Sequence, residues 1–186
     1  MFDLDLFKSE LSAAVAGEAS PPAIREIVAR AVQTPGAVLK SLGEPRRAEI
    51  QTLHRSVDLT ILNVIWGPHM TLMPHDHNMW AVIGIYTGRE DNILWRRLPE
   101  ASSGRIEAAG AKALCERDAF LLGRDIIHSV TNPIGRLTGA LHVYGGDFFS
   151  MPRSEWDPER LEERPRDVQG LFSLFEESNR LYAPRS

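Results

Sequence analysis

The chain has 186 residues, of which 43% are apolar and 25% are charged, and its formal net charge at neutral pH is −4. This composition is typical of one globular domain with a hydrophobic core, and nothing in the charge balance indicates that the protein binds nucleic acid or an anionic membrane. Residues 59–75 form the longest stretch without charge, but their two prolines argue against a membrane span. An acidic N-terminus and a single cysteine, Cys115, predict a cytoplasmic protein without an intrachain disulfide.

The first fifty residues have the apolar periodicity of helices. Apolar residues recur every three or four positions in residues 4–15, which predicts one amphipathic helix. Ser20 followed by two prolines is typical of an N-cap with proline in the first turn, and it opens a second helix over residues 23–33. A short third helix is predicted over residues 37–43.

Beyond residue 50 the pattern changes to short segments rich in β-branched and aromatic residues. Turn-forming residues separate these segments at intervals of roughly ten residues, a spacing typical of an antiparallel sandwich or barrel. The expected strands are residues 58–66, 80–86, 92–97, 106–115, 118–123 and 137–145.

After residue 150 the chain becomes polar and is interrupted by prolines. The charged run 159–167 is interpreted as a solvated face, and the amphipathic segment 167–182 is predicted to pack a helix across the outside. We therefore expect one mainly β domain in three parts: helices in residues 1–50, a small barrel in residues 51–150 and a helical tail in residues 151–186.

Two histidines stand two positions apart in the stretch MPHDHNMW. In an extended strand, residues i and i+2 point to one face, so His75 and His77 would lie side by side as two ligands of one metal ion. A hydrogen-bonded pair without metal is the alternative. A third histidine, His128, follows the expected strand 118–123, at a position that suits a return to the same mouth of a barrel. Three neutral imidazoles suit iron, zinc, copper or nickel and leave coordination positions open, as catalytic sites do.

These residues resemble the motifs of the cupin superfamily, whose fold is a double-stranded β-helix. The segment 74–77, PHDH, is similar to the first cupin motif, and residues 128–132, HSVTN, are similar to the second. Many cupins add a glutamate ligand shortly after the histidine pair, where this chain has Ala81 and Val82. A three-histidine cupin without that glutamate resembles the thiol dioxygenases of the cysteine dioxygenase type.

The resemblance implies further site residues. The segment ALHVY resembles the S-L-H-x-Y strand of that family and implies His142 and Tyr144 as catalytic residues beside the metal. Both would share one face of a strand, although a histidine among apolar neighbours can also be a core residue. Arg55, in His54-Arg55-Ser56 just before the first expected strand, resembles the arginine that binds the substrate carboxylate, and a surface arginine is the alternative. Because Val82 stands where the family has a cross-linked cysteine, no thioether is expected.

The implied activity is an Fe(II)-dependent dioxygenase that converts a small thiol, of the cysteine or 3-mercaptopropionate type, and O₂ to a sulfinate. Zinc or nickel could occupy the same three imidazoles in a purified sample. Two alternatives stay open: a three-histidine cupin dioxygenase for a non-thiol substrate such as a diketone, and a metal-binding cupin that is not an enzyme. The particular thiol, the metal used in the cell and the oligomeric state are likewise open.

Overall fold

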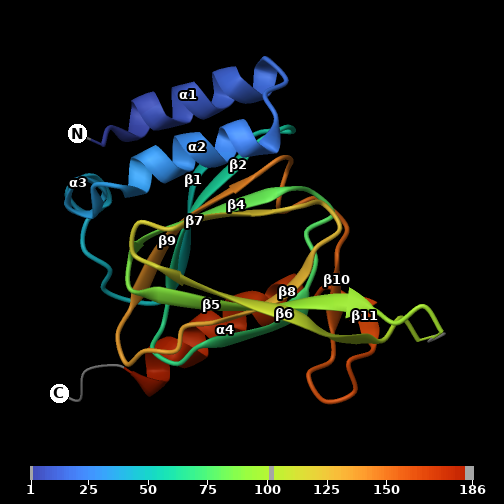
Figure 1. Cartoon of the computed structure of the whole chain (residues 1–186). Helices are drawn as coiled ribbons and strands as arrows, with labels where there is room; N and C mark the ends of the chain where they lie inside the picture. Colours follow the sequence, from blue (N-terminus) through green and yellow to red (C-terminus); the bar gives the residue numbers. More distant parts are fainter. Residues whose placement is uncertain (1, 101–102, 183–186) are drawn as a thin grey trace.

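The computed structural model describes residues 2–100 and 103–182 (Figure 1). Its helices are α1 (Leu4–Ala16), α2 (Pro21–Val32), α3 (Pro35–Leu42) and α4 (Val168–Leu181). Its strands are β1 (Glu49–Arg55), β2 (Thr60–Trp66), β3 (Thr71–His75), β4 (Ala81–Thr87), β5 (Arg89–Arg97), β6 (Ile106–Cys115), β7 (Ala119–Leu122), β8 (Ile127–Thr131), β9 (Thr138–Tyr144), β10 (Ser154–Trp156) and β11 (Glu163–Pro165).

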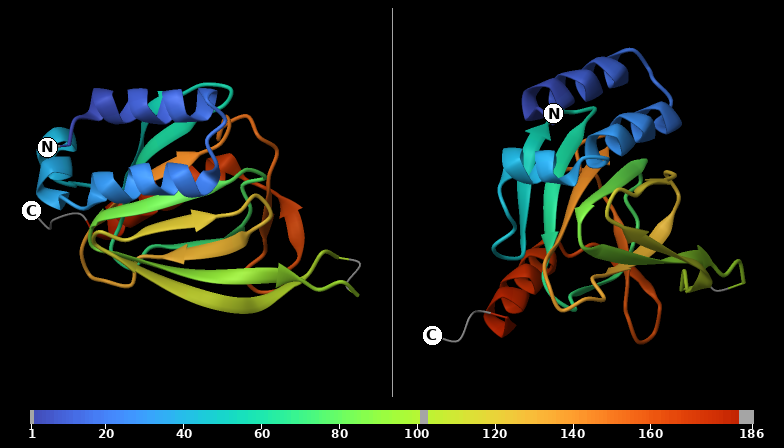
Figure 2. Two further views of the ribbon diagram at one scale, coloured as in Figure 1. Left: turned by 45° about the horizontal axis from the view of Figure 1, so that its top comes forward. Right: turned by 60° about the vertical axis from the view of Figure 1, so that its left-hand side comes forward.

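The strands form two antiparallel sheets that face each other (Figure 2). One sheet has the order β1-β2-β9-β4-β7 and the other has the order β11-β10-β3-β8-β5-β6. Within them, β2-β9-β4-β7 faces β3-β8-β5-β6, which is the strand order of a jelly roll, or double-stranded β-helix. The predicted mainly β fold, with helices at both ends, is therefore confirmed.

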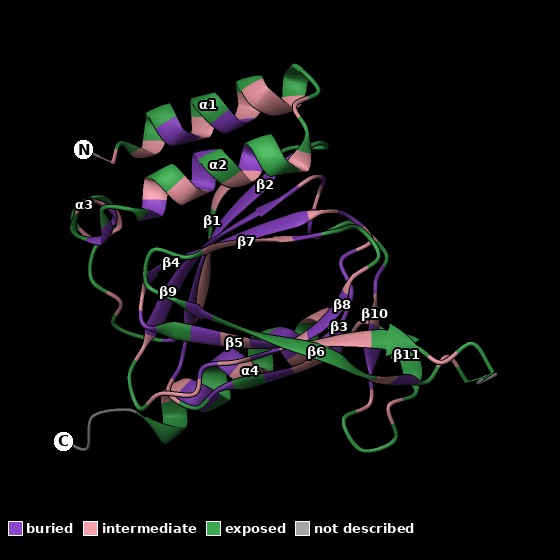
Figure 3. Cartoon of the chain, viewed as in Figure 1, coloured by how far each residue is buried: buried purple, intermediate pink, exposed green. Residues whose placement is uncertain are grey.

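Two apolar layers hold the elements together, and they lie on opposite faces of the first sheet. On β9, Ala140 and Tyr144 point between the sheets, whereas Leu141 and Val143 point toward the N-terminal helices. This alternation follows from the two-residue period of a strand. It places every second residue of β9, His142 included, in the interior of the barrel, where the buried residues concentrate (Figure 3).

The helix α2 lies directly on β4 of the first sheet. Gly84 permits this close approach, because a Cβ atom at that position would lie 2.5 Å from Cγ1 of Val28. As predicted, Ser20 is the N-cap residue of α2, with prolines at the first helical positions. The helix α3 begins at Pro35, earlier than expected, since proline is tolerated in a first helical turn. In the described part of the chain, no helix combines the length and the hydropathy that a membrane span requires.

The C-terminal part differs from the expected helical tail. Two short strands, β10 and β11, precede α4, and β10 extends the second sheet by pairing with β3. The charged run 159–167 is not wholly a solvated face either, because the Arg166 side chain is only 4% exposed. The helix α4 packs as predicted, with Leu171 and Phe175 buried against the barrel core. Residues 151–182 thus add two short strands to the second sheet before α4 packs against the barrel core.

Candidate metal centre

The three histidines predicted as ligands converge inside the barrel. His75, the last residue of β3, pairs directly with His128 of β8, and their ring centroids are 4.6 Å apart. The ring of His77 lies 5.0 Å from each of the other two. Each histidine offers one ring nitrogen, and these three nitrogens lie within 4.8 Å of one another. The three residues could therefore hold a metal ion.

His77 reaches this cluster from a loop, so the expectation of a continuous strand through both histidines is wrong. After β3 ends at His75, Asp76 makes two hydrogen bonds with Ser154: its amide donates to the Ser154 carbonyl at 3.1 Å, and its carboxylate accepts a 2.8 Å hydrogen bond from the Ser154 amide. Asp76 therefore points away from the cluster and anchors the segment 152–156. The same two-residue offset still brings both imidazoles to one side. His128 follows β7, as expected, and lies in the next strand, β8.

Hydrogen bonds fix the orientation of two of the rings. Nδ1 of His75 donates to the Met73 carbonyl at 2.9 Å, and Nδ1 of His128 donates to Oδ1 of Asn92 at 2.7 Å. Because these oxygens can only accept, each ring carries its proton on Nδ1 and has a free lone pair on Nε2. Nε2 of His128 is buried without a partner among the described residues. A buried, unpaired acceptor is costly, and a metal ion at this point would satisfy it.

The electrostatic surroundings keep the three rings neutral. Burial, followed by the charge of Arg166, holds the pKa of His75 well below its ordinary value. Burial also lowers the pKa of His77, together with the neighbouring His128 and the cation of Arg153. The pKa of His128 is lowered to about 4, again chiefly by burial. Neutral imidazoles are the form that coordinates a metal, so the cluster is ready to bind one at neutral pH.

These shifts predict that the metal-free protein loses stability in acid. The pKa of His128 is 6.5 in the unfolded chain and about 4 in the folded chain. Between these two values the unfolded chain binds a proton at His128 and the folded chain does not. The contribution of His128 to the free energy of unfolding is therefore at its full value above about pH 6.5. It falls by roughly 3 kcal/mol as the pH is lowered toward 4. Urea unfolding of wild type and of His128→Leu across this range measures the difference. Equal pH slopes in the two proteins would contradict the prediction.

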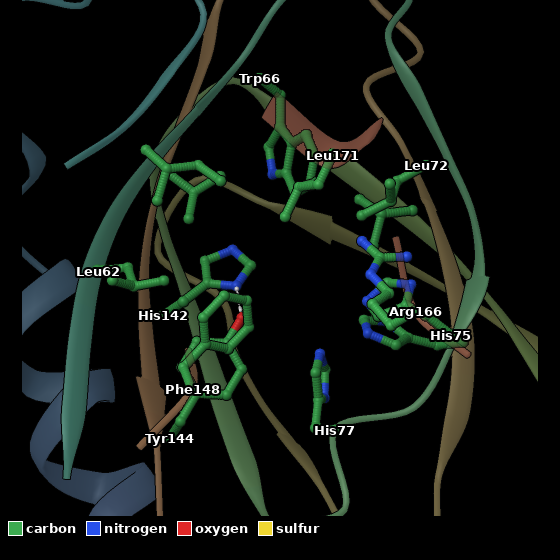
Figure 4. Close-up of a pocket in the computed structure, with 14 residues that line it drawn as sticks. Leu62, Trp66, Leu72, His75, His77, His142, Tyr144, Phe148, Arg166 and Leu171 are labelled. Carbon is green, nitrogen blue, oxygen red and sulfur yellow. Dashed lines mark hydrogen bonds between the residues drawn. The ribbon is translucent and has the colours of Figure 1, made fainter. Parts of the chain in front are cut away.

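The cluster lines one side of a small cavity of about 20 Å³ (Figure 4). This volume is enough for about one water molecule or a metal ion. The polar lining consists of the three histidines with His142, Tyr144 and Arg166, and the remaining lining residues are apolar: Ile50, Leu62, Val64, Trp66, Leu72, Val130, Phe148 and Leu171.

His142 and Tyr144 lie on the wall of the cavity opposite His75 and His77 (Figure 4). Both point inward from β9, and Nδ1 of His142 lies 3.1 Å from the Tyr144 hydroxyl. The Tyr144 ring stands edge-on to His77, with their centroids 5.1 Å apart. Burial raises the pKa of Tyr144, so the phenol keeps its proton at neutral pH. The structure thus brings together five of the six site residues expected from the sequence.

Arg55 is the sixth, and the structure does not place it in the cavity. It ends strand β1, which the sequence analysis did not predict, instead of preceding the first strand. Its guanidinium makes two 2.9 Å hydrogen bonds to the carboxylate of Asp147 on the exposed surface. Residues 49–55 give little apolar signal because Ile50 and Leu53 are their only apolar residues and none of the seven is fully buried.

Two arginines that sequence reasoning missed lie beside the histidines. Arg166 lines the cavity and is held by the buried carboxylate of Glu155, with 3.2 Å between Nη1 and Oε2. Arg153 is 7% exposed, and its guanidinium lies 3.9 Å from the ring centroid of Phe148, which is itself a lining residue. Both come from the segment that follows the barrel, and they make this end of the site positive.

Glu90 is the other residue that sequence reasoning missed. It lies in β5 on the same face as Asn92 and is fully buried. Its carboxylate accepts hydrogen bonds from Nε1 of Trp66 at 2.7 Å and from Nδ2 of Asn92 at 3.1 Å, and it lies 3.5 Å from Nε2 of His142. Burial raises the pKa of Glu90, but the contact with His142 and the Asn92 hydrogen bond outweigh burial and lower it overall.

No family model matches the sequence. A cupin from Methanocaldococcus jannaschii is similar in structure, with a TM-score of 0.47 and 10% identity over 57% of this chain and 87% of that one. A double-stranded β-helix protein from Klebsiella pneumoniae has a TM-score of 0.42 and 9% identity over 67% and 90% of the two chains. The Mn(II) oxalate decarboxylase of Bacillus subtilis has a TM-score of 0.40 and 19% identity, and the match spans 51% of this chain and 23% of the enzyme.

Proposed function

We propose that this protein is a non-haem Fe(II) dioxygenase for a small thiol that carries a carboxylate, such as cysteine or 3-mercaptopropionate. The reaction is RSH + O₂ → RSO₂⁻ + H⁺, in which both oxygen atoms are added to sulfur. The observation that carries the proposal is the cavity itself, where three neutral imidazoles face the His142–Tyr144 pair across a space lined by apolar side chains.

The ligand set suits a catalytic metal. Three imidazoles from His75, His77 and His128 would hold the ion and leave positions free for substrate. Such an ion would supply a Lewis acid that ionises a thiol and an electron source for O₂. Fe(II) fits the proposed redox chemistry, whereas zinc, which is redox-inert, would bind the same nitrogens without supporting it.

The surrounding residues would orient the thiol and exclude water. The Tyr144 hydroxyl, held by His142, is placed to hydrogen-bond the substrate beside the histidines. Apolar side chains such as Leu72 and Leu171 line the cavity and lower its local dielectric constant, which strengthens the electrostatic interactions within it.

Arg166 is the proposed partner of the substrate carboxylate, a role that the sequence analysis had given to Arg55. Replacing Arg166 by methionine should raise KM for 3-mercaptopropionate roughly 10- to 100-fold, because a charge-assisted hydrogen bond is lost. KM for cysteamine, which has no carboxylate, should change little. The matched control is Arg55→Met, which removes an exposed guanidinium paired with Asp147. An increase in KM with Arg55→Met and none with Arg166→Met would return the role to Arg55.

Oxygen uptake by the Fe(II)-loaded protein tests the proposed function. Cysteine, 3-mercaptopropionate and cysteamine are offered in turn, with a diketone as the non-thiol comparison. Uptake with a carboxylate-bearing thiol supports the proposal. Uptake with the diketone alone favours the non-thiol dioxygenase, and no uptake with any of them, from protein shown to hold iron, favours a cupin that binds metal without catalysis.

A further inference from the structure

Glu90 connects the two halves of the site. One carboxylate oxygen, Oε1, accepts from Asn92, whose own oxygen accepts the Nδ1 proton of His128. The other oxygen, Oε2, accepts from Trp66 and faces Nε2 of His142. A single buried charge is thus linked to a candidate metal ligand on one side and to the His142–Tyr144 pair on the other.

In the contact between Glu90 and His142, the donor and the acceptor can be assigned. Nε2 of His142 is buried without a hydrogen-bond partner among the described residues, and Oε2 of Glu90 lies 3.5 Å from it. A side-chain shift of a few tenths of an ångström would bring the pair into hydrogen-bond range. A carboxylate can only accept, so the nitrogen that faces it is favoured as the protonated one.

We propose that Glu90 is a positioning residue that holds the proton of His142 on Nε2, so that the Tyr144 hydroxyl donates to Nδ1 and turns an oxygen lone pair toward the cavity. The inference deepens the proposed function and rests on it for the identity of the substrate. The geometry is that of a carboxylate that fixes the tautomer of a histidine, which in turn orients a hydroxyl.

This arrangement sets what the cavity can recognise. With its own proton given to His142, Tyr144 accepts a hydrogen bond from the ligand. An ammonium group, or a thiol before the metal ionises it, can supply that bond, whereas a thioether or a carboxylate at the same place cannot. The opposite tautomer of His142 would reverse this preference, because Nδ1–H would donate to the phenol oxygen and leave the hydroxyl proton for the ligand.

Long-range ¹⁵N–¹H NMR of the histidine rings in the zinc-loaded protein measures the tautomers directly. His75 and His128 serve as internal references, since both donate from Nδ1. The expected result is that His142 shows the opposite pattern, with its proton on Nε2. A proton on Nδ1 of His142, alone or together with one on Nε2, would overturn the proposal. No thiol or O₂ is present, so this outcome is separate from whether the protein is a dioxygenase.

The variant Glu90→Gln tests the cause. A carboxamide has one accepting oxygen in place of two and cannot accept from Trp66, Asn92 and His142 together. The share of His142 rings with the proton on Nδ1 should therefore rise from near zero to a majority. The control is Asp91→Asn, an adjacent acid that pairs with Arg89 at the surface and should leave the spectrum unchanged. An unaltered His142 pattern in Glu90→Gln would remove Glu90 from this role.

Discussion

Replacing His128 by alanine is expected to abolish metal retention while the chain stays folded. The bound metal should fall from about one ion per chain to near zero, because two imidazoles cannot complete a stable site. The fold should persist, since the barrel core around Val130 and Leu72 does not depend on a ligand. His75→Ala and His77→Ala should behave in the same way. Elemental analysis of each purified variant, with circular dichroism for the fold, measures both quantities.

The matched control is His69→Ala. His69 lies in the same part of the sequence but outside the cavity, and its ring packs 6.2 Å from that of Tyr182. This variant should keep its metal. Full occupancy in His128→Ala would contradict the assignment of the centre, whereas loss of metal in His69→Ala would show that the measurement reports folding rather than coordination.

Replacing His142 by alanine is expected to keep the metal and lose turnover. His142 is not one of the three clustered ligands, so the metal content should match wild type. Without its ring, the Tyr144 hydroxyl loses the 3.1 Å partner that orients it, and turnover should fall roughly 100-fold or more. Steady-state oxygen uptake by the iron-loaded variant gives kcat and KM separately.

Tyr144→Phe provides the comparison for that result. It removes only the hydroxyl and keeps the ring that packs against His77 and Phe148. If the pair acts as one unit, the losses of turnover in the two variants should be similar and should not add in the double variant. Wild-type kinetics in His142→Ala would contradict the prediction and show that the role of His142 is structural.

Most of the fold and five residues of the candidate site could be predicted from the sequence, whereas Glu90, Arg153 and Arg166 could not. Strong periodicity identified the helices α1 and α2, and the short β-branched segments identified a barrel. The spacing of His75, His77 and His128 identified a cluster that the structure brings together. These features could be predicted because they depend on local patterns, in which side-chain direction follows directly from secondary structure.

The missed residues depend on contacts that no local pattern records. Glu90 stands in a segment with polar residues on both faces, so apolar alternation does not show which face is buried. Arg166 belongs to a charged run, and it is buried only because the carboxylate of Glu155 meets it from β10. Arg55 was given a role from its place along the chain, but Asp147, far away in sequence, holds its guanidinium at the surface.

The most direct test of the central proposal is the product formed under ¹⁸O₂. The iron-loaded protein is incubated with the thiol that supports oxygen uptake, and the product is analysed by mass spectrometry. The account predicts a sulfinate that carries two labelled oxygen atoms and is absent with His128→Ala. A disulfide or an unlabelled product from protein that holds iron would contradict the thiol dioxygenase proposal.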